Sequence, residues 1–243
     1  MNQTIQQLFD RKSIRVFTDR EITSHEKDLI LRSAVQAPTA GNQQLYTIID
    51  VTDQAVKDTL VKTCDSQPFI ATAKMVLIFC ADCKKWYDAF RFAGCDPRAP
   101  GVGDLALAIS DATIAAQNAV VAAESLGIGS CYIGDIMENC EQHRQLLHLP
   151  SYVFPCCMLV FGFPTRQQMD RKKPQRSPMD SIVHENHYHE MDAAQLEAML
   201  GIRAAQGNTY ASWISAFCKR KYNSGFSREM SRSVGEYLKD FLK

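Results

Sequence analysis

The sequence lacks the features that mark nucleic-acid-binding and exported proteins. Its 27 Lys and Arg residues balance its 27 Asp and Glu residues, so there is no basic surplus to neutralise a phosphate backbone. The first residues show no basic start followed by an apolar core, as a secretory signal would. Internal repeats, low-complexity tracts and blocks of like charge are also missing. We therefore expect a cytoplasmic protein that binds neither nucleic acid nor membrane.

Long apolar runs free of polar residues are missing as well. The most apolar stretch, 105–126, contains Asp111, Gln117, Asn118 and Glu124, which argues against a membrane span. It belongs to a predicted helix at 102–125 that is rich in alanine and stops at Gly127. Small residues on several faces let other helices approach closely. We expect this helix at the centre of the domain or in a dimer interface.

The nine cysteines are an odd and scattered set. Several lie inside apolar runs, as Cys156 and Cys157 do, which is typical of reduced cysteines packed as small hydrophobic residues in a cytoplasmic protein. Cys80 and Cys83 have the spacing of a redox or zinc pair. No second Cys/His pair at zinc-site spacing accompanies them, so a structural role is favoured and a redox role is left open.

Four apolar runs predict strands, at 46–51, 75–81, 129–133 and 153–161. Helical patterns lie between them, including one at 24–36 and one that runs from Asp53, as N-cap, to about residue 63. This alternation favours an α/β or α+β domain. The segment 162–179, with three prolines and five basic residues, predicts a loop or extended arm. Helical patterns return at 192–205 and around Trp213 and Tyr237.

Two segments combine residue types suited to an anionic ligand. In Arg11-Lys12-Ser13-Ile14-Arg15, guanidinium groups and a hydroxyl could converge on a phosphate through charge-assisted hydrogen bonds. A solvated basic turn is the alternative. On the arm, Lys173 and Arg176 could meet the same phosphate or simply decorate a loop.

Two further segments are turns that could face a flat ring. At 37–43, Pro38 and Gly41 break the preceding helix, and small residues expose backbone amides. At Tyr132-Ile133-Gly134-Asp135, the glycine would let a ring system approach the backbone. An ordinary turn is the alternative in both places.

A histidine run follows the arm. His184, His187 and His189 lie in an extended segment, where a metal site is the alternative to contacts across a dimer.

Taken together, these segments make the chain resemble the FMN-dependent nitroreductases, within them the oxygen-insensitive nitroreductases and NADPH–flavin oxidoreductases. The resemblance covers about residues 5–188. It rests on Arg-Lys-Ser-Ile-Arg-Val-Phe from Arg11, Ala-Pro-Thr-Ala-Gly-Asn from Ala37, Glu-Ser-Leu-Gly-Ile-Gly-Ser-Cys-Tyr-Ile-Gly from Glu124 and Val-His-Glu-Asn from Val183, in the family's order and spacing. It implies an α+β three-layer sandwich, with a mainly antiparallel sheet flanked by helices, in a domain-swapped homodimer. Residues 1–190 would form the FMN-binding domain and 191–243 a C-terminal helical extension packed on it.

The resemblance also implies which residues hold FMN. Arg11, Lys12, Ser13 and Arg15 correspond to positions that bind the phosphate, ribityl chain and ring edge. Gln67 corresponds to a side chain near the ring, and Tyr132, Ile133, Gly134 and Asp135 to the segment beside it. Arg176 and Lys173 correspond to phosphate ligands on the arm. Pro38, Thr39, Ala40 and Asn42 belong to the turn that the partner subunit contributes.

The activity implied is hydride transfer from NADPH or NADH to nitroaromatics, quinones or free flavin in ping-pong fashion, with no catalytic side chain. Two positions depart from the family pattern. Lys173 and Arg176 are separated by two residues instead of one, and Arg203 lacks a basic neighbour in the following 206–209 segment, which leaves NADPH preference open. A flavin-storing protein without turnover, a zinc-dependent protein and a reductase of the same fold with another acceptor are the competing hypotheses.

Overall fold

A four-stranded sheet forms the centre of the structure, a computed structural model that describes residues 1–204 and 207–242. Its strands are β1 (Tyr46–Asp50), β2 (Met75–Asp82), β3 (Gly129–Ile133) and β4 (Val153–Gly162), in the spatial order β1-β2-β4-β3. Every neighbouring pair is antiparallel. The α+β alternative predicted from the sequence is therefore confirmed. All four predicted strands are present, with ends that differ by one residue at most.

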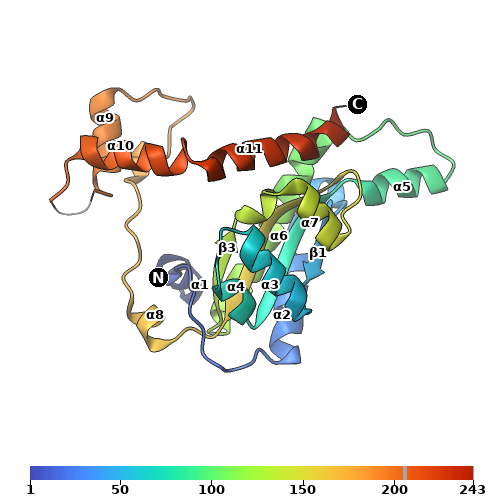
Figure 1. Cartoon of the computed structure of the whole chain (residues 1–243), viewed down its shortest axis with the longest axis horizontal. Coiled ribbons are helices and arrows are strands. Elements are labelled where there is room, and N and C mark those ends of the chain that lie inside the picture. The colour runs from blue at the N-terminus through green and yellow to red at the C-terminus, as the bar shows by residue number, and fades with distance from the viewer. Residues whose placement is uncertain (205–206, 243) are drawn as a thin grey trace. The chain divides into compact units, whose positions relative to one another are not determined.

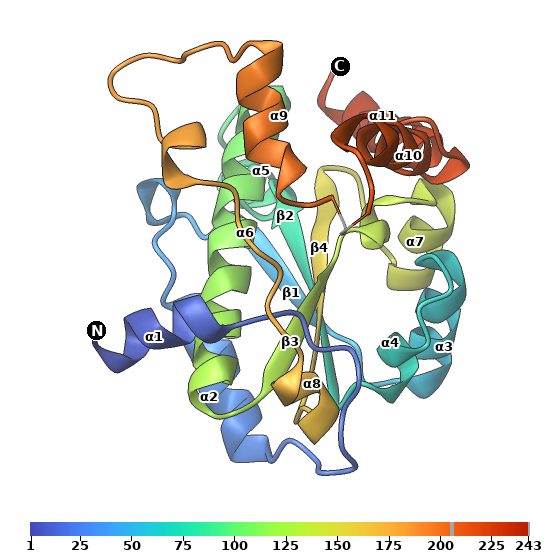
Figure 2. The same cartoon turned by 90° about the vertical axis from the view of Figure 1, so that its left-hand side faces the viewer.

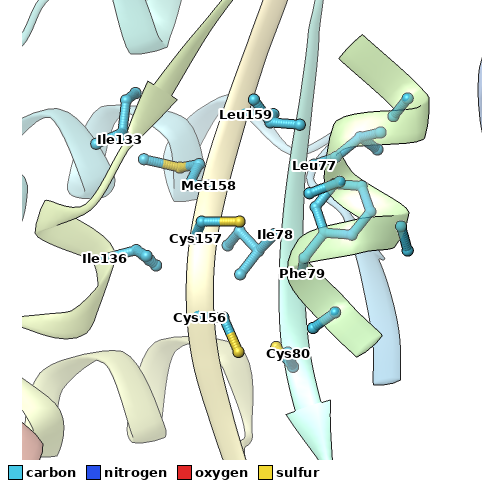
Figure 3. Packing of buried hydrophobic residues seen from close by; sticks show 14 of the residues in the cluster. Leu77, Ile78, Phe79, Cys80, Ile133, Ile136, Cys156, Cys157, Met158 and Leu159 are labelled. Carbon is cyan, nitrogen blue, oxygen red and sulfur yellow. The ribbon is translucent and has the colours of Figure 1, made fainter. Parts of the chain in front are cut away.

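Helices cover both faces of the sheet, so the fold has three layers (Figure 2). One layer holds α2 (Ser24–Val35) and α6 (Val102–Ser125); the other holds α3 (Gln54–Thr63), α4 (Phe69–Thr72) and α7 (Cys140–Leu147). Alternate residues of a strand point to opposite faces. Figure 3 shows this in β2, where Leu77 and Phe79 point toward α6, while Ile78 between them points to the opposite face. Both central strands, β2 and β4, are buried along their whole length.

The alanine-rich helix α6 packs across the sheet and against α2. Nine of its residues are buried, and six of these are alanines, which let the helix lie close to its neighbours: Leu105, Ala108, Asp111, Ala112, Ala115, Ala116, Ala119, Val120 and Ala123. Gly127, at φ +72°, ends the helical segment as predicted. Among the described residues, α6 is the one helix that is long and apolar enough to cross a bilayer by length and composition.

Local capping explains where two of the helices begin. Thr23 and Glu26 form a capping box at the start of α2, and the Asp53 carboxylate accepts a hydrogen bond from Ala55 N at the start of α3. The helix after Asp53 was predicted from this same residue. Among the described residues, five helices were not predicted as elements: α1 (Gln3–Asp10), α4, α5 (Lys84–Phe92), α7 and α8 (Arg166–Asp170). Each has ten residues or fewer, so its apolar period is too short to stand out from loop sequence.

The chain divides into two compact units, residues 1–171 with 229–243, and residues 172–228. The boundaries between these units lie at 171/172 and 228/229, and the division at 190/191 between an FMN-binding domain and a C-terminal extension stays a prediction. The second boundary falls inside α11 (Gly225–Leu238), drawn in red in Figure 1. The last part of α11 and the following η4 (Lys239–Phe241) contribute buried residues to the core of the first unit. Ser233 and Tyr237 are among them.

The remaining elements include several at the ends of the chain and on the arm. The first unit also contains α1 (Gln3–Asp10), α8 (Arg166–Asp170) and the short 3-10 turns η1 (Ala40–Asn42) and η2 (Asp135–Met137). The second contains η3 (Met179–Ser181), α9 (Ala193–Gly201) and α10 (Tyr210–Lys221). The arm predicted at 162–179 is thus interrupted by one short helix. The helix predicted at 192–205 ends earlier, at Gly201, and its predicted last residue lies outside the described part of the chain.

Candidate functional site

The basic N-terminal segment lies in extended form along the end of the sheet. Ile14 N donates to Ser130 O at 2.9 Å, and Thr18 N donates to Phe163 O at 2.8 Å. Two glycines that face each other in the sheet make room for it. A Cβ on Gly129 would lie 2.5 Å from an Ile14 side-chain atom, and one on Gly162 would lie 2.6 Å from the Phe17 ring. Packing therefore requires both glycines and fixes residues 13–18 against β3 and β4.

Arg11 leads into this segment and points toward β3. Its Nη2 lies 3.4 Å from Ser130 Oγ, and its guanidinium carbon lies 5.9 Å from the centre of the Tyr132 ring. Its Nε is buried and has no hydrogen-bond partner. Because an unpaired buried donor costs about 1–3 kcal/mol, this N–H is suited to donate a hydrogen bond to an anionic ligand. The structure thus brings Arg11 together with Tyr132, and their shared role in one cofactor site stays a prediction.

Lys12 and Ser13 bind the middle of the segment 162–179 that was predicted as the arm. The Lys12 ammonium donates to Met169 O, and to Arg171 O at 2.5 Å. In return, the Arg171 guanidinium donates to Ser13 O. Lys12 therefore anchors the main chain just before the second unit. Its predicted role in cofactor binding stays a prediction.

Arg15 is exposed at the far end of this basic cluster. Its backbone N donates to Gln168 Oε1 at 3.3 Å, and its guanidinium carbon lies 5.9 Å from the centre of the Phe69 ring. Phe69 follows Gln67 by two residues, so Arg15 and Gln67 are near each other in the fold. Gln67 itself is half-buried, and its Nε2 donates to Cys64 O at 3.0 Å.

The segment after β3 combines a protonated phenol with an unobstructed glycine. The Tyr132 hydroxyl donates to Gln117 Oε1 of α6 at 3.3 Å, and burial raises its pKa, so it remains a donor. Gly134 adopts φ −81°, which any residue tolerates, and a Cβ there would meet only Met137 Cε, at 3.7 Å. Neither backbone conformation nor internal packing explains this glycine. Ile133 is buried and Asp135 begins η2.

The turn with Pro38, Thr39, Ala40 and Asn42 is held by a buried acid that the motif interpretation did not include. Asp111 of α6 is 3% exposed; its Oδ1 accepts from Ala40 N at 2.9 Å and its Oδ2 from Leu45 N at 3.2 Å. Gly41 and Asn42 both have φ +56°. A carboxylate inside an alanine-rich helix was the available sequence signal for this contact. It explains why a charged residue lies in the buried face of α6.

The remaining predicted ligands, Lys173 and Arg176, belong to the second unit. Their meeting with the N-terminal cluster therefore stays a prediction. Arg203, considered for the nucleotide phosphate, donates from Nη2 to Ser177 Oγ at 3.1 Å within the same unit. Its following segment begins with Gln206, which lies outside the described residues.

The alternative metal and thiol chemistries find little support in the geometry. Burial raises the pKa of both Cys80 and Cys83 to about 12, so these thiols stay protonated and unreactive near neutral pH. His184 Nδ1 accepts a hydrogen bond from His189 N at 3.1 Å. Within residues 1–204 and 207–242, no three His, Cys, Asp or Glu side chains are grouped to hold a metal ion.

Comparison with known proteins identifies the family. Residues 8–163 match the nitroreductase family. This chain belongs to the nitroreductase family. Its resemblance to the oxygen-insensitive nitroreductases and flavin reductases, predicted from four motifs, is thereby confirmed.

Individual relatives agree over most of the chain. FMN reductase [NAD(P)H] of Bacillus subtilis is 32% identical, with 98% of this chain and 91% of that protein covered. Oxygen-insensitive NADPH nitroreductase of Salmonella typhimurium is 35% identical, with 79% and 77% covered. The solved structure of NADPH:FMN oxidoreductase from Vibrio harveyi, complexed with NAD⁺, matches with a TM-score of 0.80 at 26% identity, covering 96% of this chain and 98% of that one.

Proposed function

We propose that this chain is an FMN-dependent oxidoreductase that uses NADPH or NADH to reduce nitroaromatics, quinones or free flavin. One observation carries the proposal. The buried, unpaired Nε of Arg11 lies in a basic segment that is packed against β3, directly beside the residues leading to Gly134. Membership of the nitroreductase family and the names of its relatives, which include an FMN reductase and an NADPH nitroreductase, support it.

The residues present fit FMN. Arg11 offers a buried N–H without a partner, which suits an anionic or strongly accepting ligand atom. Neither its φ nor the packing around it requires a glycine at position 134. The missing side chain leaves space beside the backbone, which suits a flat ring. Arg11, Ser13 and Arg15 would hold the phosphate, the ribityl chain and the ring edge, with Gln67 and the 132–135 segment at the ring. Lys12 would act by anchoring the arm that carries Lys173 and Arg176.

When bound, FMN supplies a carrier that takes a hydride equivalent from the nicotinamide and passes two electrons to the acceptor, alternately on one open face. The chain's own side chains therefore bind and orient. No side chain is proposed as nucleophile or general base. Cations near the ring and phosphate would stabilise the negative charge of the bound FMN.

We further propose a homodimer through the uncovered face of α6. Its outward residues follow one another at alternating steps of four and three, which is the spacing of a helix–helix contact line: Gly103, Leu107, Ser110, Ile114, Gln117 and Val121. Leu107 and Ile114 are 51% and 40% exposed in the single chain. The turn held by Asp111 would extend from this face into the partner's site, as the family pattern implies. The free state of all nine cysteines is in keeping with a cytoplasmic location.

A spectroscopic titration tests the proposed function. The purified protein, supplied with FMN if needed, is expected to show flavin absorption that is bleached anaerobically by NADPH or NADH and restored by nitrofurazone or a quinone. A comparison of the two nucleotides measures the donor preference that Arg203 leaves open. No flavin binding after FMN is supplied would overturn the proposal. A bound flavin that neither nucleotide reduces would instead indicate a flavin-storing protein.

A further inference from the structure

Two polar side chains hold the end of α3: the buried His143 of α7, and the half-buried Asn139 that precedes this helix. His143 is fully buried; its Nδ1 lies 2.9 Å from Ile136 O and its Nε2 lies 2.8 Å from Thr63 Oγ1. Burial lowers the pKa of His143, so the ring is neutral: Nδ1–H donates to the carbonyl, and Nε2 accepts the Thr63 hydroxyl, which also lies 3.2 Å from Thr59 O. Asn139 Nδ2 donates to Thr63 O at 2.8 Å. The last residue of α3 is thus held through both its hydroxyl and its carbonyl.

Asn139 makes this contact from an unfavourable backbone conformation. It has φ +51° at the N-cap of α7, yet its side chain makes no cap bond there. Strain of this kind persists only where the surroundings impose it. Here the neighbouring contacts come from α11: Asn139 N donates to Glu229 Oε1 at 3.1 Å, and Cys140 N donates to Ser233 Oγ at 2.9 Å. The amide of Asn139 is therefore directed to Thr63 instead of to its own helix.

These contacts join two segments assigned to the flavin. Thr63 precedes Gln67 by four residues, and Ile136 follows Gly134 by two. Between Thr63 and Gln67, Asp65 and Ser66 both have positive φ, and the Gln67 amide bonds back to Cys64 O. The Gln67 loop is thus closed upon itself, and its place relative to β3 depends on what holds Thr63.

We propose that His143 and Asn139 are positioning residues: by holding Thr63, they set the spacing between the Gln67 loop and the Tyr132–Gly134–Ile136 segment around the flavin ring. This inference rests on the proposed function. Neither residue is expected to touch flavin. Each residue acts through the main chain of a segment that would contact the flavin.

Substitution of Thr63 tests the inference with little change of shape. Thr63→Val removes the hydroxyl that His143 Nε2 accepts, and loss of one buried hydrogen bond predicts a rise of about 5- to 10-fold in the Kd for FMN. We also expect a shifted flavin absorption band and midpoint potential, which a general loss of stability would not produce. Thr63→Ser, which keeps the hydroxyl, restores the values of the unaltered chain.

Two further variants complete the experiment. Thr59→Val, one turn earlier in α3, removes a hydroxyl that bonds only Ala55 O of its own helix at 2.9 Å, and should leave FMN affinity unchanged. Asn139→Gly keeps the left-handed backbone accessible but loses the amide, and should weaken FMN as Thr63→Val does. Unchanged affinity, spectrum and potential in both Thr63→Val and Asn139→Gly would overturn this inference alone. An unaltered chain that fails to bind FMN would overturn the proposed function and this inference with it.

Discussion

At the scale of single residues, Arg11 differs from the other cations of the N-terminal segment. Lys12 is bound to two main-chain carbonyls and Arg15 is exposed, whereas Arg11 keeps a buried N–H without a partner. A charged donor in that position gains more from an anionic ligand than an exposed one, because solvent screens it less. Arg11 is therefore the cation on which FMN binding should depend most.

Arg11→Ala should raise the Kd for FMN by at least about 10-fold, as expected for loss of a charge-assisted hydrogen bond. Fluorescence quenching during an FMN titration measures it. Arg32→Ala is the matched control, because Arg32 is an exposed arginine that pairs with Asp28 inside α2. Equal affinity in the Arg11 and Arg32 variants would contradict the assignment.

Glu138 is a second residue whose environment is unusual. It is 6% exposed, and its Oε1 is buried without a partner. Burial, with the nearby carboxylates of Asp135, Asp65 and Glu229, raises its pKa to about 7. The folded chain therefore binds a proton more readily than the unfolded chain between about pH 4.5 and 7. Stability should rise as the pH falls through this range, and be lowest above it.

Glu138→Gln should remove this dependence. At pH 8 the variant should be more stable than the unaltered chain, by at most about 3 kcal/mol for a shift of this size, and the two should converge below about pH 4.5. Urea unfolding at several pH values measures the difference. A constant difference between the two chains from pH 5 to pH 8 would show that Glu138 does not titrate in this range.

At the scale of elements, the contact between the N-terminal segment and the sheet depends on Gly129. A methyl group there would overlap Ile14, and the facing Gly162 is equally restricted by Phe17. Gly129→Ala should therefore lower the free energy of unfolding by about 1–3 kcal/mol, as overpacking does. It should also weaken FMN, because residues 11–15 would shift.

Gly235→Ala in α11 is the matched control, since nothing lies within 4 Å of its added Cβ. It should stabilise the chain by about 0.5–1 kcal/mol through its helix propensity. Urea midpoints of the two variants should thus move in opposite directions. A Gly129→Ala variant as stable as the unaltered chain would refute the packing argument.

At the scale of the whole molecule, the proposed dimer depends on the uncovered face of α6. Ile114→Asp places a charge at the middle of that contact line and should convert the dimer to a monomer, because an unpaired charge is costly in a buried interface. Light scattering during gel filtration measures the mass. Gln142→Asp, at an exposed position of α7, should leave the dimer intact. A monomeric unaltered chain, or a dimeric Ile114→Asp variant, would contradict this interface.

The sequence by itself determined the strands, the long alanine helix and the family, because alternation, helix period and four ordered motifs are local properties. Only the tertiary structure decided which distant residues meet. Arg11 reaches Ser130 across 119 residues, Asp111 holds Ala40 across 71, and His143 holds Thr63 across 80. The return of residues 229–241 to the core was likewise decided by packing. Such contacts arise from how whole elements fill the space around the sheet, and no local pattern encodes that choice.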